Sequence, residues 1–353
     1  MRRCTLQAAR IFGGLALGVA IFLDGSSACG QTREMHASLA GQLRIFQLRV
    51  MSGRISASGP TTHRNLTSNT NQDRSRERLT IDLKGGRPDV TYERIAPDER
   101  FVIDIDDGTK VSAQMIPRSM SDRAAVNFLQ PVDGPLVLTV STDSESKRYQ
   151  AATVWHLMLI EPEVCREHLL PLLEVLRPAW KLGEQSEEIE NLLCHGKEGR
   201  PAIRHYSWQQ LIGELASNRY VERERAERQL HALGPIILPF LRSQEPPALD
   251  PEQAFRIRRL LRELSPDAGE DTSERVVAWL TEDASVWFAL LRRDDEGVRY
   301  IATERLSGLL NTRVDFDPAA SNAVRDHQWA ELRQRFSAVL DSVAPASPEQ
   351  KSD

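Results

Sequence analysis

The sequence predicts an α+β protein in which an N-terminal antiparallel β-rich domain precedes an all-α domain. Two observations predict this order. From about residue 42 to residue 141, apolar residues alternate with polar ones between turn residues, whereas a helical period begins after about residue 147. All six tryptophans, which carry large apolar surfaces, lie in the helical half, at positions 155, 180, 208, 279, 287 and 329.

Length and composition limit the classes of protein that this chain can belong to. Its 353 residues are enough for two domains, and 41% hydrophobic with 27% charged residues is an ordinary globular composition. The chain carries 45 basic and 50 acidic residues, a net charge of −5. Nucleic-acid binders usually have a basic excess, so we expect no nucleic-acid partner.

The first 30 residues have the anatomy of a secretory signal peptide. Arg2, Arg3 and Arg10 make the start positive, Ile11 to Leu23 is apolar, and small residues follow around Cys29. The apolar run is short for a membrane span, although a buried helix or a single anchor is the alternative. We expect residues 1–30 to be removed and the protein to be secreted or periplasmic. It would be held at a membrane only if Cys29 is lipidated.

Two cysteines, Cys165 and Cys194, remain after that removal. A secreted compartment permits a disulfide between them, and closing a loop of about 30 residues would contribute roughly 3 kcal/mol. Two unrelated buried thiols are the alternative, because cysteine often acts as a small core residue. The sequence leaves both interpretations open, with a disulfide as the expectation to be tested.

Residues 31–146 are predicted to form the β domain. Strands are expected at 43–51, 78–84, 89–95, 100–106, 109–116, 124–130 and 136–140, with tight turns at Gly85-Gly86 and Asp107-Gly108. A stretch at about 56–77 is rich in Ser, Thr, Asn and Arg and has almost no apolar residues. We therefore expect a long mobile loop there rather than a packed element.

The helical half is predicted to have three parts. Residues 147–200 should form connecting helices at 151–160 and 163–176, with a kink at Pro171, and then a polar connection with a short helix at 189–193. Residues 201–343 form the main helical domain. Residues 344–353 are expected to be a disordered tail.

An apolar pattern recurs in the main helical domain, as Ala226-x3-Leu230-x2-Leu233 and again from Ile257 and from Ala302. The segments 219–241 and 294–306 around it resemble units of secreted bacterial HEAT-like helical repeat proteins, a largely uncharacterised group. The resemblance covers roughly residues 150–340. It implies stacked helix pairs and says almost nothing about function. The unequal offsets of 31 and 45 residues depart from a regular repeat, and a non-repeating helical bundle is the alternative.

Well-defined catalytic and cofactor motifs are absent from the sequence. It contains no P-loop, no Gly-x-Gly-x2-Gly, no His-Glu-x2-His and no Gly-x-Ser-x-Gly. We therefore predict no catalytic residue, no cofactor and no metal site. A metal could be considered only at a scattered set of thiols and imidazoles. Its members are Cys165, His168, Cys194, His195, His205 and His156. We favour the interpretation in which the histidines bind no metal and the two cysteines form a disulfide.

Two further charged segments have a plain structural interpretation beside a functional one. The run from Asp104 to Gly108 could bind calcium, but the same residues make an ordinary Asp-Gly hairpin turn. The segment 255–264 is an arginine-rich amphipathic helix, in which Ile257 and Leu260 should face the core while Arg256 and Arg259 face solvent. An acidic partner for those arginines is the alternative.

Taken together, these patterns favour a secreted or periplasmic protein–protein interaction module without catalysis. Stacked helix pairs present a broad surface, which suits an unknown protein partner in the cell envelope better than a small molecule. One alternative is a hydrolase or carbohydrate-acting enzyme that uses β-domain carboxylates such as Asp104 and Asp106. Another is a curved sheet that carries a lipid or other ligand on an open apolar face.

Overall fold

The computed structural model describes residues 39, 46–61, 64–72, 74–118, 123–142, 144–177, 180–196, 205–244, 249–265 and 269–340. Strands come first in these residues and helices follow, which confirms the α+β class. The expected signal peptide, with Cys4 and Cys29, and the expected tail at 344–353 lie outside the described residues.

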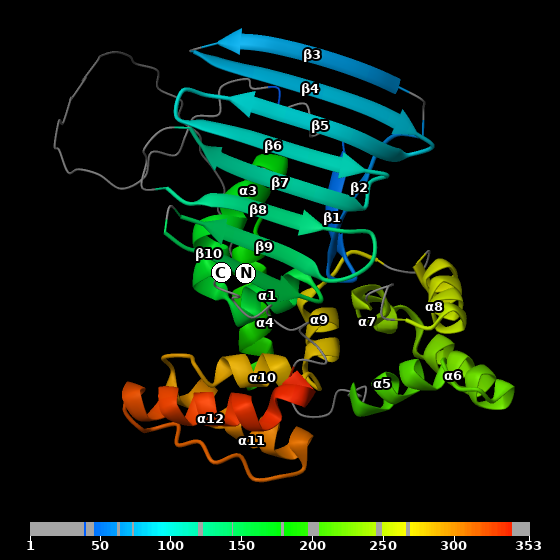
Figure 1. Ribbon diagram of the computed structural model, residues 1–353, viewed down its shortest axis with the longest axis vertical. Helices are drawn as coiled ribbons and strands as arrows, with labels where there is room; N and C mark the ends of the chain where they lie inside the picture. The colour runs from blue at the N-terminus through cyan, green and yellow to red at the C-terminus, as the bar shows by residue number, and fades with distance from the viewer. Residues whose placement is uncertain are drawn as a thin grey trace, which may run out of the picture. The chain divides into compact units, whose positions relative to one another are not determined.

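The dominant element is an eight-stranded antiparallel sheet in which every strand pairs with the next one along the chain (Figure 1). Such a meander needs only short turns, and the predicted turns at Gly85-Gly86 and Asp107-Gly108 are present with positive φ angles. Its strands are β3 (Arg64–Gln72), β4 (Ser75–Lys84), β5 (Arg87–Ile95), β6 (Glu99–Asp106), β7 (Lys110–Pro117), β8 (Ala125–Gln130), β9 (Leu136–Ser141) and β10 (Ser146–Ala151).

One face of the sheet is buried and the other is open. In β4, Leu79, Ile81 and Leu83 are buried, while the alternate residues from Arg76 to Lys84 are partly or fully exposed. This alternation is the two-residue period that predicted the strands. Helices pack against the buried face, with contacts to β7, β8 and β10.

A separate hairpin crosses one end of the sheet (Figure 1). It consists of β1 (Gln47–Met51) and β2 (Arg54–Ser58). The backbone N–H of Gly59 donates to the carbonyl of Gly86 at 2.9 Å, and that of Ala57 donates to the carbonyl of Gly108 at 2.7 Å. The N–H of Ile55 reaches the side chain of Gln130 at 2.8 Å. The β2 segment therefore ties the β4–β5 turn, the β6–β7 turn and the end of β8 together.

The prediction of a mobile loop at about 56–77 is wrong. Residues up to Ser58 belong to β2, residues 64–72 form β3, and β4 begins at Ser75. β3 is an edge strand, and its outward residues are exposed Asn and Thr side chains. Because an edge strand covers little of the core, it lacks the apolar alternation by which a strand is recognised. The last strand, β10, was missed for the same reason, since its first three residues are exposed.

The helices follow the sheet in chain order. The predicted polar connection at 183–199 is instead a helix of 14 residues, α4. The elements are α1 (Val154–Ile160), α2 (Pro162–Val164), η2 (Cys165–Leu169), α3 (Leu170–Leu176), α4 (Leu182–His195), α5 (His205–Glu214), α6 (Tyr220–Leu233), η3 (Gly234–Ile237), α7 (Leu238–Ser243), α8 (Pro251–Leu264), α9 (Ser273–Leu280), α10 (Ala284–Leu290), α11 (Glu296–Leu310) and α12 (Asn322–Leu340).

A π-helical turn stands where a kink at Pro171 was predicted. In η2, the N–H of Leu170 donates to the carbonyl of Cys165, five residues earlier. Proline has no N–H, and its ring crowds the carbonyl four residues before it in an α-helix. The widened turn directly before Pro171 accommodates both effects within the helical path.

The helices α6 and α8 lie side by side and share a buried ion network. Arg256 donates to Glu224 at 2.9 Å and to Glu252 at 2.7 Å, and it also pairs with the buried Glu227. The prediction that Arg256 faces solvent is therefore wrong, since its side chain is only 6% exposed. The helical period separated apolar from polar positions, but it could not show that a neighbouring helix supplies the carboxylates.

The hairpin is joined to the helices by the carboxylate of Asp271, which lies just before α9. One oxygen accepts the N–H of Ser52 at 2.8 Å, and the other accepts the N–H of Gly53 at 2.7 Å. The indole N–H of Trp155 donates to the second oxygen at 2.9 Å. The β1–β2 turn, α1 and the start of α9 are thus held at one buried point.

Gly53 is also in close contact with α1. Its carbonyl accepts the N–H of Val154 at 2.9 Å, and its φ is +72°. A Cβ atom added at Gly53 would lie 2.3 Å from the Cβ of Thr153. Both the backbone conformation and the space at this turn therefore require glycine.

We expect Gly53→Ala to lower the free energy of unfolding by more than about 2 kcal/mol, because strain and overpacking add. Gly85→Ala is the matched control. Gly85 has a φ of +60° but no atom within 4 Å of an added Cβ, so its cost should be about 1 kcal/mol. Urea unfolding measures both variants. An equal loss of free energy of unfolding in both variants would show that the contact with Thr153 does not contribute to the cost.

Asp271 should make stability depend on pH. Burial raises the pKa of Asp271 from 3.8 to about 6, against the opposing effect of its hydrogen bonds. The native state then binds this proton more tightly than the unfolded state does. The wild-type free energy of unfolding should therefore decrease as the pH rises from 4 to 6.5, by on the order of 3 kcal/mol.

The variant Asp271→Asn isolates this titration. We expect it to be less stable than wild type at pH 4, because the amide NH2 cannot accept from Gly53 or Trp155. The asparagine side chain cannot ionise, however. The difference in free energy of unfolding between wild type and the variant should therefore shrink as the pH rises through 6. Unfolding curves at pH 4, 5, 6 and 7 test this, and a constant difference between the two proteins would contradict it.

Candidate functional site

The residues considered as metal ligands do not form a cluster. His156 is buried in α1, Cys165 lies in η2, and Cys194 and His195 end α4. His168 has a half-buried side chain 3.8 Å from the carboxylate of Glu167. The side chain of His205 lies outside the described part of the chain. Among the described residues, no group of three or more His, Cys, Asp or Glu side chains is arranged to hold a metal ion.

His156 instead links the N-termini of two helices. Thr153 caps α1, and its hydroxyl lies 2.7 Å from Nδ1 of His156. Nε2 of His156 lies 2.8 Å from Asp283, which caps α10 by accepting the N–H of Ser285. The order Thr–His–Asp has the form of a nucleophile, base and orienting acid. His156 is only 1% exposed and Asp283 is fully buried, so no substrate reaches them, and their role is structural.

Cys165 and Cys194 are free thiols, so the expected disulfide is not formed. Burial raises the pKa of the Cys165 thiol far above its usual range, and it raises the pKa of Cys194 to about 11. The thiolate is the reactive form of cysteine, so neither group is suited to nucleophilic chemistry. Cys165 donates to the carbonyl of Leu157 at 3.4 Å and packs in the core.

The acidic run Asp104–Gly108 forms a hairpin turn. Asp107 and Gly108 have φ angles of +49° and +67°, and Asp107 pairs with Arg87 at 2.9 Å. Asp106 lies 3.4 Å from the ammonium of Lys110. Asp104 and Asp106 are both exposed on the open face of the sheet. This arrangement gives the hydrolase alternative no geometric support.

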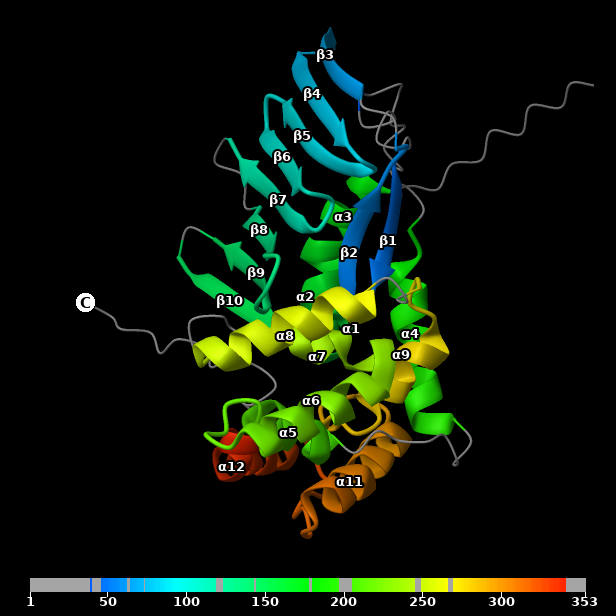
Figure 2. The same ribbon diagram turned by 90° about the vertical axis from the view of Figure 1, so that its right-hand side faces the viewer.

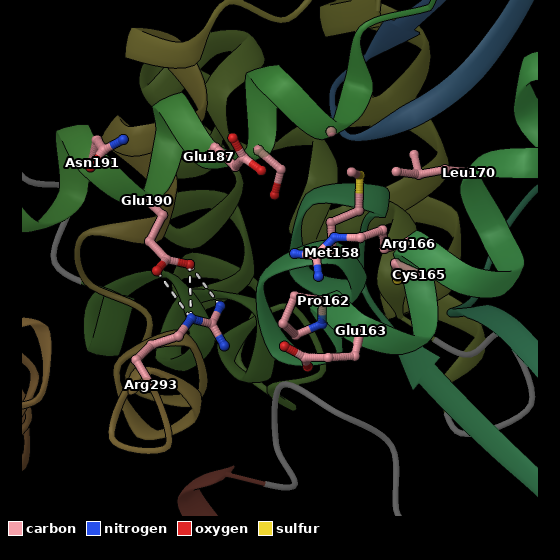
Figure 3. Close-up of a pocket in the computed structure, with 12 residues that line it drawn as sticks. Met158, Pro162, Glu163, Cys165, Arg166, Leu170, Glu187, Glu190, Asn191 and Arg293 are labelled. Atoms are coloured by element: carbon pink, nitrogen blue, oxygen red, sulfur yellow. Dashed lines mark hydrogen bonds and ion pairs between the residues drawn. The ribbon is translucent and has the colours of Figure 1, made fainter. Parts of the chain in front are cut away.

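A cavity of about 400 Å³ lies between α2–η2 on one side and α4 on the other (Figure 3). We call it the α2–α4 cleft. Its lining joins apolar side chains and charged side chains of both signs, and no sequence motif predicted it. The lining residues are Met158, Pro162, Glu163, Cys165, Arg166, Leu170, Gly183, Ser186, Glu187, Glu190, Asn191 and Arg293.

One pair of charges in the cleft is already satisfied. The guanidinium of Arg293, which follows α10, holds the carboxylate of Glu190 by two N–H groups, at 3.0 Å and 2.7 Å. A further N–H of Arg293 donates to the carbonyl of Leu159 at 2.7 Å. This forked geometry fixes one wall of the cleft and joins α4 to the end of α1.

The remaining charges in the cleft have no such partner. Glu163, Arg166 and Glu187 make no hydrogen bond or ion pair with any other residue in the described part of the chain. Figure 3 shows the side chain of Arg166 projecting into the space between α2 and α4. The cleft can therefore offer both a cation and carboxylates to a ligand.

A second candidate binding feature is the free edge of the sheet. Beyond β3 there is no further strand among the described residues (Figure 2). Residues 65–72 of β3 contain no Pro and no charged residue. At the opposite edge, β10 carries the exposed Lys147 and Arg148. Charges and prolines are the usual protection of a sheet edge, so β3 is an unprotected one.

No protein-family model, no curated protein and no solved structure matches this chain. In the portion of the chain that the structure describes, no helix is both long and apolar enough to cross a membrane.

We expect peptide mapping to recover Cys165 and Cys194 as free thiols. In the folded protein at pH 8, Cys165 should resist iodoacetamide because it is buried and protonated, and the partly buried Cys194 should react slowly because its pKa is raised to about 11. After unfolding without a reductant, both should be alkylated completely. A peptide pair joined through these two cysteines would contradict the free-thiol structure.

Proposed function

We propose that this protein is a non-catalytic binding module that takes an extended segment of a protein partner at the free edge of β3. The observation that carries the proposal is the free edge of β3, in which residues 65–72 contain neither a charged residue nor a proline. A partner strand laid along β3 would gain backbone hydrogen bonds, which is how sheet edges bind extended peptides in general.

The side chains of β3 fit this use. Asn65, Thr67, Asn69 and Asn71 are exposed on the open face of the sheet, where they remain available as hydrogen-bonding groups. On the other face, Leu66 is half-buried and packs against the core. The strand is thus anchored through one side to its own fold, while its outer edge offers main-chain donors and acceptors.

The context of the proposal comes from the sequence. A signal peptide at residues 1–30 would place the module in the periplasm or outside the cell, in contact with envelope proteins. The helical half would be a HEAT-like array, in which α6 and α8 are neighbouring helices joined by their shared ion network. In this proposal the helical part holds the hairpin and the sheet, while the sheet edge binds the partner.

The other functions considered from the sequence have less support. Exposed carboxylates on an open sheet face do not make the closed site that a glycosidase needs. A lipid carrier needs an open apolar face, whereas the apolar face of this sheet is filled by core side chains such as Ile103, Phe128 and Leu138. We therefore propose neither of them.

The test uses two variants with the same change in charge. Thr67→Lys/Asn69→Lys adds two cations to the edge strand. Thr91→Lys/Asn127→Lys adds two cations to the same exposed face, but on the central strands β5 and β8. Charged edge residues oppose strand addition, so we expect only the edge variant to lose its partner.

The measurement is crosslinking and affinity capture with the tagged protein in an extract of its native cell envelope. A partner that is recovered with wild type and with the central-strand variant, but reduced about tenfold or more with the edge variant, supports the proposal. Equal recovery with both variants, or no partner above a tag-only control, would count against it. Thermal unfolding of each variant confirms that the fold is intact.

A further inference from the structure

The α2–α4 cleft has properties of a small-molecule site that partner binding at β3 does not use. Its volume of about 400 Å³ lies within the range of ligand pockets, roughly 300–1,000 Å³. It holds unpaired charges of both signs beside an apolar surface. We propose that this cleft binds a small zwitterion, namely an amino acid or a short peptide with free termini.

The unpaired cation defines one end of the ligand. The planar guanidinium of Arg166 can bind a carboxylate through two parallel N–H groups. Its side chain projects into the cleft and has no protein partner in the described part of the chain (Figure 3). A ligand carboxylate would supply that partner.

The carboxylates define the other end. Glu163 lies on α2 and Glu187 on α4, so they approach the cleft from its two sides. Neither has a hydrogen bond or ion pair within the described residues. An ammonium group donates up to three hydrogen bonds, so a carboxylate on either side of the cleft can accept from it. With Arg166 counted, the free charges of the cleft sum to −1, so a ligand that carried only a carboxylate would meet net repulsion.

The rest of the lining indicates what length of ligand and what kind of side chain the cleft would accept. Met158, Pro162 and Leu170 give the cleft an apolar surface for an aliphatic side chain. The paired Glu190 and Arg293 close one wall without a net charge, so they do not compete for the termini. A ligand of one to three residues would satisfy the charges and cover the apolar lining together.

The backbone that carries Arg166 is unusual in a way that agrees with a binding role. Arg166 lies in the π-helical turn η2, directly after α2. A π turn widens the helix and redirects its side chains, and such turns recur at functional sites. Here the turn places Arg166 at the cleft while Cys165, its neighbour, remains buried.

The first test measures binding by isothermal titration with one dipeptide, leucyl-alanine, and its two blocked forms. N-acetyl-leucyl-alanine lacks the ammonium, and leucyl-alanine amide lacks the carboxylate. We expect the free dipeptide to bind with a Kd below about 1 mM and each blocked form to bind about tenfold or more weakly. Free leucine, titrated alongside, shows whether a single residue is sufficient.

The second test locates the binding. Arg166→Ala should weaken binding of the free dipeptide about tenfold or more while leaving binding of its amide unchanged. Glu163→Gln/Glu187→Gln should weaken binding of the free dipeptide but not of the acetylated form. Arg258→Ala is the control, since Arg258 is an exposed arginine on α8, outside the cleft. It should bind as wild type does.

The proposal would be overturned by any of three results. These are no saturable binding of leucyl-alanine or leucine, equal binding of the free and blocked dipeptides, or unchanged binding in Arg166→Ala. Because the side chains of Arg166, Glu163 and Glu187 are all exposed to solvent, the variants should keep the wild-type unfolding temperature. The β3 edge variant should bind the dipeptide normally, so failure here is independent of the proposed partner site.

Discussion

The carboxylate of Asp271 joins parts of the chain that are more than 200 residues apart. It accepts both N–H groups of the β1–β2 turn and the indole N–H of Trp155. Its own backbone N–H donates to Val50 in β1 at 2.8 Å, and its carbonyl accepts from Gln185 in α4. An ionisable group so far from water costs free energy unless its oxygens are fully bonded. This requirement fixes the hairpin, α1, α4 and the start of α9 against one another.

The same junction continues into the helical half. Thr153 lies against Gly53 of the hairpin turn and also bonds His156, which reaches Asp283 at the start of α10. Each of these polar groups is buried and each has a partner, which is the condition for a polar network inside a core. The β1–β2 hairpin and the helices are therefore joined through a polar network and not through apolar contacts alone.

The fold class and most strands could be predicted because they leave a local signal. Alternation in β4 to β9 and the Asp107-Gly108 turn are visible within ten residues of sequence. β3 left no such signal, since an edge strand of Asn, Thr and Ser needs little apolar surface. Arg256 was misplaced because its partners Glu224 and Glu227 belong to another helix. A local period cannot show which element lies beside a polar face.

The candidate sites depend even more on contacts between distant residues. Nothing in the sequence around Arg166, Glu187 or Arg293 marks them as neighbours, because the cleft arises from three separate segments. The scattered Cys and His residues drew attention through their type alone, and the fold keeps most of them apart. The π turn could be expected only in part. Pro171 signals a disturbed helix, but the kind of disturbance depends on the packing around it.

The way in which β2 crosses the sheet has a consequence for the order of folding. The meander from β3 to β10 contains only pairings between consecutive strands, which close short loops and form rapidly. β2 is made earlier on the ribosome, but its bonds to Gly86, Gly108 and Gln130 need turns that emerge later. Asp271 comes later still. The first strands to be synthesised are thus among the last to form their native contacts. The hairpin can be held in place only after the segments that bind it have been made.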